Sequence, residues 1–389
     1  MNPCLSLFGL PWLGRMTFCA IILLFPAQGR CDEWCEDLRT DSQTQCMQIV
    51  DTKPKVSGPE VAEQDSQTKQ AKEEKSKDAE KSKDGEKSTS EPKKPRSPKM
   101  GLEMARKVMP QDGSGFINDR AVHMLGDAQV NRLMKSGDTT PLRELHKQFN
   151  RRSCKLNLTP ESQAPVSSEL LYLNQRKSVV AIMFSRKHND HWHVTLAATG
   201  FMITADGAMV TNRHVVRSMG TNPDECMFVM TSDAKIHPVK AVLASNEAND
   251  VAICQVAGDG FHSLPLRSNT PVGTSVRMIS HPKGRLYTLS KGIVSRRYAK
   301  SAAKRVPGDA EKVKLDFSKT TNWVTVTADF GKGSSGAPLF DPLGNVIGVA
   351  AITNNLTVER KDDTISQMVF RDCVPAEVVL EMIKPVDQP

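Results

Sequence analysis

Residues 331–340, Gly-Lys-Gly-Ser-Ser-Gly-Ala-Pro-Leu-Phe, decide how the C-terminal half of the chain is interpreted. A β-rich run at residues 323–327 precedes this stretch, and another at residues 345–352 follows it. Glycines, serines and a proline between two strands indicate a tight loop that brings backbone N–H groups close to a serine hydroxyl. Acyl transfer needs such a nucleophile with oxyanion donors beside it. A plain turn between two strands is the alternative, so residues elsewhere in the chain decide between them.

Two upstream stretches supply the partners that a serine nucleophile needs. His214 ends an apolar strand that begins at Met209, and Asp250 lies at the mouth of another apolar strand. The order His, Asp, Ser, each at the edge of a β element, is the order of the chymotrypsin-like triad. In such a triad neutral His214 would take the proton of Ser335, and Asp250 would stabilise the resulting imidazolium.

Four stretches together resemble the protease domain of the HtrA (Deg) family of trypsin-like serine proteases. They are residues 199–216, 249–256, 272–295 and 333–349, and the similarity runs from about Ser178 to Ile383. The resemblance implies a mainly β fold, a chymotrypsin-like double six-stranded antiparallel β-barrel with the active site between the barrels. It implies a serine endopeptidase that acts on unfolded polypeptides without a cofactor or a metal.

The resemblance also assigns roles to individual residues. His214 would be the general base, Asp250 its orienting carboxylate and Ser335 the nucleophile, with the amides of Gly333 and Ser335 as the oxyanion hole. The chain departs from the resemblance in four places: no PDZ domain is recognised after residue 383, Ser334 replaces the aspartate of digestive proteases, Ala337 replaces a common glycine, and Asp329 stands where HtrA proteins usually have a small or apolar residue. We therefore expect activity that does not depend on a new N-terminal amine pairing with that aspartate.

Two residues are candidates for substrate binding. Asp329 lies six residues before Ser335, the spacing at which trypsin-like enzymes that cleave after Arg or Lys carry the aspartate at the base of the primary pocket. A buried carboxylate there would attract a basic side chain; the alternative is that Asp329 faces solvent or caps the turn. Thr353 stands where many trypsin-like enzymes have a glycine, and would narrow the pocket entrance. If Asp329 lines the pocket, a basic loop predicted at residues 296–314 becomes a candidate self-cleavage site.

The sequence of the N-terminal quarter predicts an export signal at its start and a disordered linker at its end. Residues 1–29 contain Arg15, a short apolar run and the small-residue pattern Ala27-Gln28-Gly29, which indicate a signal peptide for a periplasmic or extracellular protein. The apolar run is short for a bilayer span, so no stable membrane insertion is expected, although an uncleaved anchor stays open. Residues 30–51 contain Cys31, Cys35 and Cys46. Their close spacing, without a nearby histidine, favours a disulfide bridge over a metal site. Residues 52–100 are a Lys/Glu/Ser-rich linker.

The remaining boundaries are residues 101–165 for a small helical segment and 166–385 for the trypsin-like serine protease domain. Gly137 is expected to end one helix, and Thr140-Pro141 to cap and begin the next. Cys254 and Cys373 lie in apolar, strand-like contexts and are expected to be small core residues. The formal net charge is +8, but the charges of the linker nearly cancel, so nucleic acid is not an expected partner. A homo-oligomer stays open.

Two classes of function remain after these steps. The first is an exported serine endopeptidase that forms an acyl-enzyme intermediate on polypeptide substrates. The second is a catalytically inactive protease fold that serves as a binding or scaffold protein. An esterase of the doubly wound α/β class fits poorly, because Ala337 stands where its nucleophile elbow needs glycine and because the triad order differs.

Overall fold

The computed structural model describes residues 98–217, 222, 225–306, 309–360 and 363–386. The predicted signal peptide, the N-terminal cysteine segment and the predicted linker up to residue 97 lie outside the described residues. The final residues of that linker, 98–100, instead begin helix α2.

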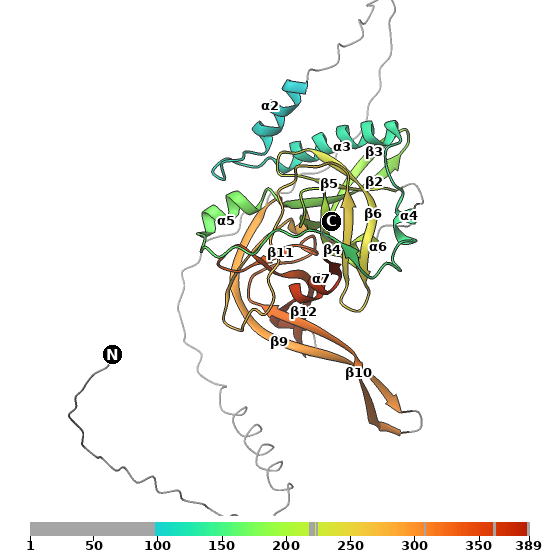
Figure 1. The fold of residues 1–389 in the computed structure, drawn as a ribbon, viewed down its shortest axis with the longest axis vertical. Coiled ribbons are helices and arrows are strands. Elements are labelled where there is room, and N and C mark those ends of the chain that lie inside the picture. The colour runs from blue at the N-terminus through green and yellow to red at the C-terminus, as the bar shows by residue number, and fades with distance from the viewer. Residues whose placement is uncertain (1–97, 218–221, 223–224, 307–308, 361–362, 387–389) are drawn as a thin grey trace, which may run out of the picture. The chain divides into compact units, whose positions relative to one another are not determined.

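An N-terminal β-barrel closes from six strands in the order β2-β3-β4-β7-β6-β5 (Figure 1). The first seven side chains of β2 are all buried, which suits its run of β-branched and apolar residues. Cys254 lies fully buried on β7, as predicted. The strand bounds are β2 (Val179–His188), β3 (His191–Met202), β4 (Ala208–Asn212), β5 (Met227–Met230), β6 (Ile236–Asn246) and β7 (Val251–Val256).

A second barrel closes in the order β10-β13-β12-β11-β8-β9, which confirms the predicted double six-stranded architecture. Its core includes Cys373, again fully buried as predicted. The strand bounds are β8 (Ser275–Ser280), β9 (Thr288–Val306), β10 (Asp309–Val326), β11 (Pro338–Phe340), β12 (Val346–Arg360) and β13 (Asp363–Pro375).

The prediction of a basic loop at residues 296–314 is wrong, because the described residues of this range, 296–306 and 309–314, lie on the paired strands β9 and β10. Strands β9 and β10 pair far beyond the barrel, and the paired ribbon is visible at the lower right of Figure 1. Charged residues at successive positions hide the period-two pattern of a half-buried strand, since neither face of such an extension needs to be apolar.

Six helices and three short elements complete the described fold. Gly137 caps α3 in the left-handed conformation (φ 75°), as predicted. The next helix starts later than expected: Pro141 precedes it as the cap residue, and Leu142 is its first residue. The bounds are α2 (Pro98–Val108), α3 (Asp119–Ser136), α4 (Leu142–His146), β1 (Cys154–Lys155), α5 (Ser168–Gln175), α6 (Arg213–Arg217), the 3₁₀ turn η1 (Pro282–Gly284), α7 (Ala376–Glu381) and β14 (Ile383–Lys384).

The segment before the barrels packs onto them. The Asp127 carboxylate on α3 accepts a hydrogen bond from the Val194 N–H on β3 (2.8 Å). Further along, β1 pairs in parallel with β14 near the C-terminus. Within the described part of the chain, no helix combines the length and the apolar character that a membrane crossing requires.

Candidate active site

His214 and Asp250 are in direct contact. The His214 Nδ1 and an Asp250 carboxylate oxygen are 2.5 Å apart, and the other carboxylate oxygen accepts from the His214 backbone N–H at 2.7 Å. Two hydrogen bonds to one carboxylate fix both the ring and the helical turn that carries it. Because Asp250 accepts at Nδ1, the ring presents Nε2 as its free nitrogen, which is the tautomer that a general base requires.

The ends of two paired strands produce this contact. Strand β4 pairs with β7, with Asn212 opposite Val251, and α6 begins at the next residue after β4. The Asp250 carbonyl accepts from the Asn212 side-chain amide (3.0 Å) and from the Arg213 N–H (3.1 Å). Asp250 itself has φ 55°, a left-handed conformation that aspartate tolerates better than most residues. These bonds hold it there.

The loop that carries Ser335 docks against the first barrel. The Thr199 N–H donates to the Ser335 carbonyl (2.9 Å), and the Thr199 hydroxyl donates to the Gly333 carbonyl (2.8 Å). Gly336 lies so close to β4 that an added Cβ would be 2.3 Å from the Thr211 hydroxyl oxygen. Thr211 lies on β4, three residues before His214. The end of β4 therefore contacts the loop of Ser335 and also leads into the helical turn that carries His214. In the described chain the Ser335 hydroxyl makes no hydrogen bond to His214.

The backbone amides of Gly333 and Ser335 have no acceptor among the described residues, whereas their neighbours do. The Ser334 N–H donates to the Gly331 carbonyl (2.9 Å) and the Gly336 N–H to the Ala350 carbonyl (2.8 Å). Gly333 has φ 99°, which a residue with a side chain rarely adopts. Two unpaired donors on either side of Ser334 suit the oxyanion of an acyl-transfer intermediate.

Ser334 and Ser335 differ in where they lie. Ser334 is fully buried and its hydroxyl donates to the Ser280 hydroxyl at 3.0 Å, so it anchors the loop to β8. Ser335 is half-buried. Only Ser335 is therefore accessible enough to attack a substrate.

His281 contacts the loop of Ser335 through Thr199. It is buried, its Nδ1 accepts from the Tyr287 N–H (3.0 Å), and its backbone N–H donates to the Thr199 hydroxyl (3.2 Å). Burial, with the positive charge of Arg176 as a smaller cause, lowers the pKa of His281 to about 3. The ring is therefore neutral and structural. Sequence reasoning did not single out Thr199 or Thr211, because a buried threonine in an apolar strand carries no signal of what it binds.

Asp329 is exposed to solvent and is not the buried pocket carboxylate considered above. Its side chain is 83% exposed, and an oxygen lies 2.9 Å from a guanidinium nitrogen of Arg371. Thr353 is exposed on β12, directly opposite Arg371 on β13. Solvent exposure follows from the position of Asp329 beyond the end of β10. Arg371 was not among the sequence candidates, because it lies far from Ser335 in the chain.

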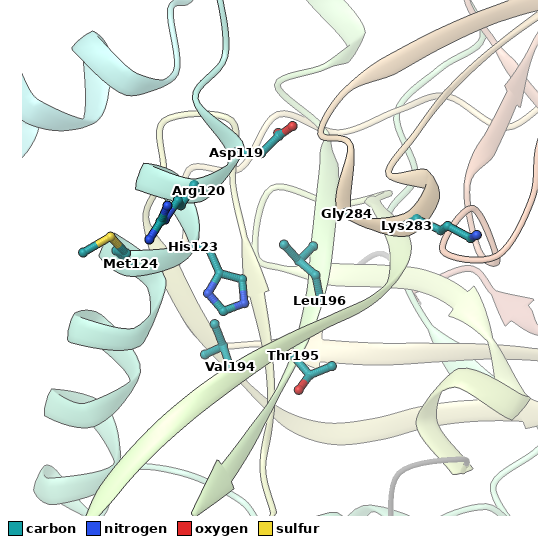
Figure 2. A pocket seen from close by; sticks show the side chains of 9 residues that line it. All are labelled: Asp119, Arg120, His123, Met124, Val194, Thr195, Leu196, Lys283 and Gly284. Carbon is teal, nitrogen blue, oxygen red and sulfur yellow. The ribbon is translucent and has the colours of Figure 1, made fainter. Parts of the chain in front are cut away.

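A cavity of about 580 Å³ lies between α3, β3 and η1. Figure 2 shows the His123 ring on α3 directed toward Val194 on β3. The cavity reaches Lys283, whose backbone N–H donates to the Lys332 carbonyl in the loop that carries Ser335 (2.8 Å). One wall of the cavity is thus the turn that contacts this loop. The lining residues are Asp119, Arg120, His123, Met124, Val194, Thr195, Leu196, Lys283 and Gly284.

The comparisons with known proteins support a trypsin-like peptidase domain. The family described as Trypsin-like peptidase domain matches residues 198–349. A probable periplasmic serine endoprotease DegP-like from Hahella chejuensis is 31% identical over 39% of this chain and 28% of its own length. The serine endoprotease DegS of Haemophilus influenzae is 23% identical over 42% of this chain and 44% of its own.

Two further proteins are similar. Protease Do-like 5, chloroplastic, from Arabidopsis thaliana is 27% identical over 48% of this chain and 55% of its own. A solved structure of the HtrA-type protease AlgW with a decapeptide has a TM-score of 0.41 and 16% identity, covering 56% of this chain and 66% of that one. The chain matches about a quarter to a half of the length of the curated relatives named here. On these sequence matches and the double barrel, the chain carries an HtrA-like, trypsin-type peptidase domain.

Proposed function

We propose that this protein is an exported serine endopeptidase that hydrolyses peptide bonds of unfolded polypeptides through His214, Asp250 and Ser335. The hydrogen bond between His214 and Asp250 is the observation that carries the proposal, since it engages Nδ1 and leaves Nε2 as the ring nitrogen that could accept the Ser335 proton. The names of relatives, several of them periplasmic serine endoproteases, support both the reaction and export.

The proposed reaction gives each of these groups one role. The Ser335 oxygen attacks the substrate carbonyl while His214 Nε2 takes the hydroxyl proton, and Asp250 stabilises the imidazolium. The oxyanion accepts hydrogen bonds from the Gly333 and Ser335 amides, a contribution of roughly 3–4 kcal/mol per donor in this class. His214 then gives its proton to the leaving amine. Water, activated by the same ring, releases the acid and restores Ser335.

The test uses the full chain, an unfolded casein-type substrate and a fluorophosphonate probe that modifies activated serines. Wild-type protein should cleave the substrate and take up the probe at Ser335. Ser335→Ala should lower turnover roughly a millionfold and abolish labelling. Ser366→Ala, a substitution at an exposed position of β13, is the matched control and should behave as wild type.

Two outcomes would contradict the proposal. Cleavage that persists in Ser335→Ala would show a different nucleophile or a contaminating protease. Absence of both cleavage and labelling in the wild type, with casein still bound, would favour the inactive binding or scaffold protein.

A further inference from the structure

Two chain segments that lead to Ser335 pair with the strand that carries Arg371. Its strand β13 lies between β10 and β12, with Val326 opposite Arg371 on one side and Thr353 on the other. From Val326 the chain runs through Asp329 into the loop of Ser335. On β12, Ala350 exchanges backbone hydrogen bonds with Gly336 and Ala337, next to Ser335. Ala350 and Thr353 are three residues apart, roughly 10 Å along a strand.

Arg371 is fixed in this place. Its side chain is 19% exposed, its Nε donates to the Phe330 carbonyl (3.2 Å), and another guanidinium nitrogen lies 2.9 Å from an Asp329 carboxylate oxygen. A guanidinium stays charged at any ordinary pH. Asp329, at 83% exposed, is the partner that solvent and substrate can reach. Arg371 therefore contributes a permanent positive charge beside the site, and Asp329 offsets it.

We propose that the Asp329–Arg371 ion pair sets the charge preference for the substrate side chain next to the scissile bond, and that it disfavours Lys and Arg there. This inference rests on the proposed peptidase function. A cationic side chain that approached Asp329 would have to compete with Arg371, which the Phe330 carbonyl holds in place, and would meet a like charge. An anionic side chain would have to displace Asp329. Uncharged side chains disturb neither partner.

The proposal predicts opposite changes in cleavage preference when one or the other partner of the ion pair is neutralised. Arg371→Gln removes the charge but keeps an amide donor of similar length for the Phe330 carbonyl, so Asp329 is left without its cation. Cuts after Lys and Arg should rise at least tenfold relative to cuts after uncharged residues. Asp329→Asn leaves Arg371 without its anion, and cuts after Asp and Glu should rise by a similar factor. Arg371→Lys keeps the charge and should stay close to wild type.

The measurement is digestion of a proteome-derived peptide library by the full chain, with the residue before each cut read by mass spectrometry. Arg297→Ala is the matched control, because it removes an arginine of the same barrel, on β9, from an ion pair with Glu377 of α7 (2.8 Å). Its cleavage profile should match that of the wild type.

The possible failures are distinguishable. A wild-type profile dominated by Lys and Arg, or a Ser335-dependent profile that neither Arg371→Gln nor Asp329→Asn changes, would overturn this inference and leave the peptidase function standing. Absence of any Ser335-dependent cut in the library would overturn the peptidase function, and the inference with it.

Discussion

At the scale of single residues, Asp250 has the most demanding position in the candidate site. It holds a left-handed backbone, accepts from the His214 ring and backbone, and presents its carbonyl to the end of β4. A substitution that keeps these hydrogen bonds but removes the negative charge should leave the fold intact. Such a substitution separates the contribution of the carboxylate to folding from its effect on the His214 ring.

Asp250→Asn should therefore fold and fail in turnover. The amide can still accept from the His214 backbone, but it can no longer fix the Nδ1–H tautomer, and kcat should fall about 10⁴-fold as in triads of this kind. Steady-state kinetics and a thermal melt check this, with the exposed Asp259→Asn as control. A kcat within tenfold of wild type would show that Asp250 does not orient the base.

At the scale of elements, the loop that carries Ser335 contains glycines of two kinds. A Cβ at Gly336 would lie 2.2 Å from the Thr199 carbonyl oxygen, and the residue has φ 83°. A Cβ at Gly331 would meet nothing within 4 Å. The first glycine is required by a backbone approach between the barrels, and the second is not.

Gly336→Ala should lower the free energy of unfolding by several kcal/mol, because backbone strain adds to a contact that cannot relax, and should remove activity. Gly331→Ala should stay within about 0.5 kcal/mol of wild type. Urea unfolding and casein cleavage measure both effects. Equal behaviour of the two variants would mean that the loop does not depend on its close contact with Thr199.

The same scale shows what could be predicted from sequence. The strand-like stretches around His214, Asp250 and Ser335 indicated a β-rich domain, and the resemblance of four such stretches to the HtrA family implied the double barrel that the structure shows. The environment of Asp329 could not be predicted, because it depends on Arg371, which pairing of β10 with β13 brings close. The extended β9–β10 hairpin was missed because strands exposed on both faces lack alternating polarity.

At the scale of the whole molecule, the barrels and the segment before them share one folded unit. The β1–β14 pairing connects residues before the barrels to the C-terminal end of the chain. The hydrogen bond between α3 and β3 connects them to the first barrel. His281 is part of the packing between the barrels, since its backbone N–H donates to the Thr199 hydroxyl and its side chain is buried. A charge on this ring would therefore be a charge in the middle of the fold.

Stability should depend on pH through His281. Its pKa is about 3 in the folded protein and about 6.5 when unfolded. Below pH 6.5 the unfolded chain binds a proton that the folded chain does not, so the free energy of unfolding falls as pH is lowered, by up to about 1.4 kcal/mol per pH unit. Above pH 6.5 this contribution to pH dependence vanishes. His281→Asn keeps an acceptor for the Tyr287 N–H but cannot titrate.

Urea unfolding at pH 6.5 and pH 4.5 tests this expectation. Between these values the wild type should lose about 2–3 kcal/mol more than His281→Asn, which is the linkage expected for that pKa difference. His188→Asn, at an exposed position on β2, is the control and should follow the wild type. Parallel curves for wild type and His281→Asn would mean that the folded protein accepts a proton on His281, and that the packing under the Ser335 loop opens in mild acid.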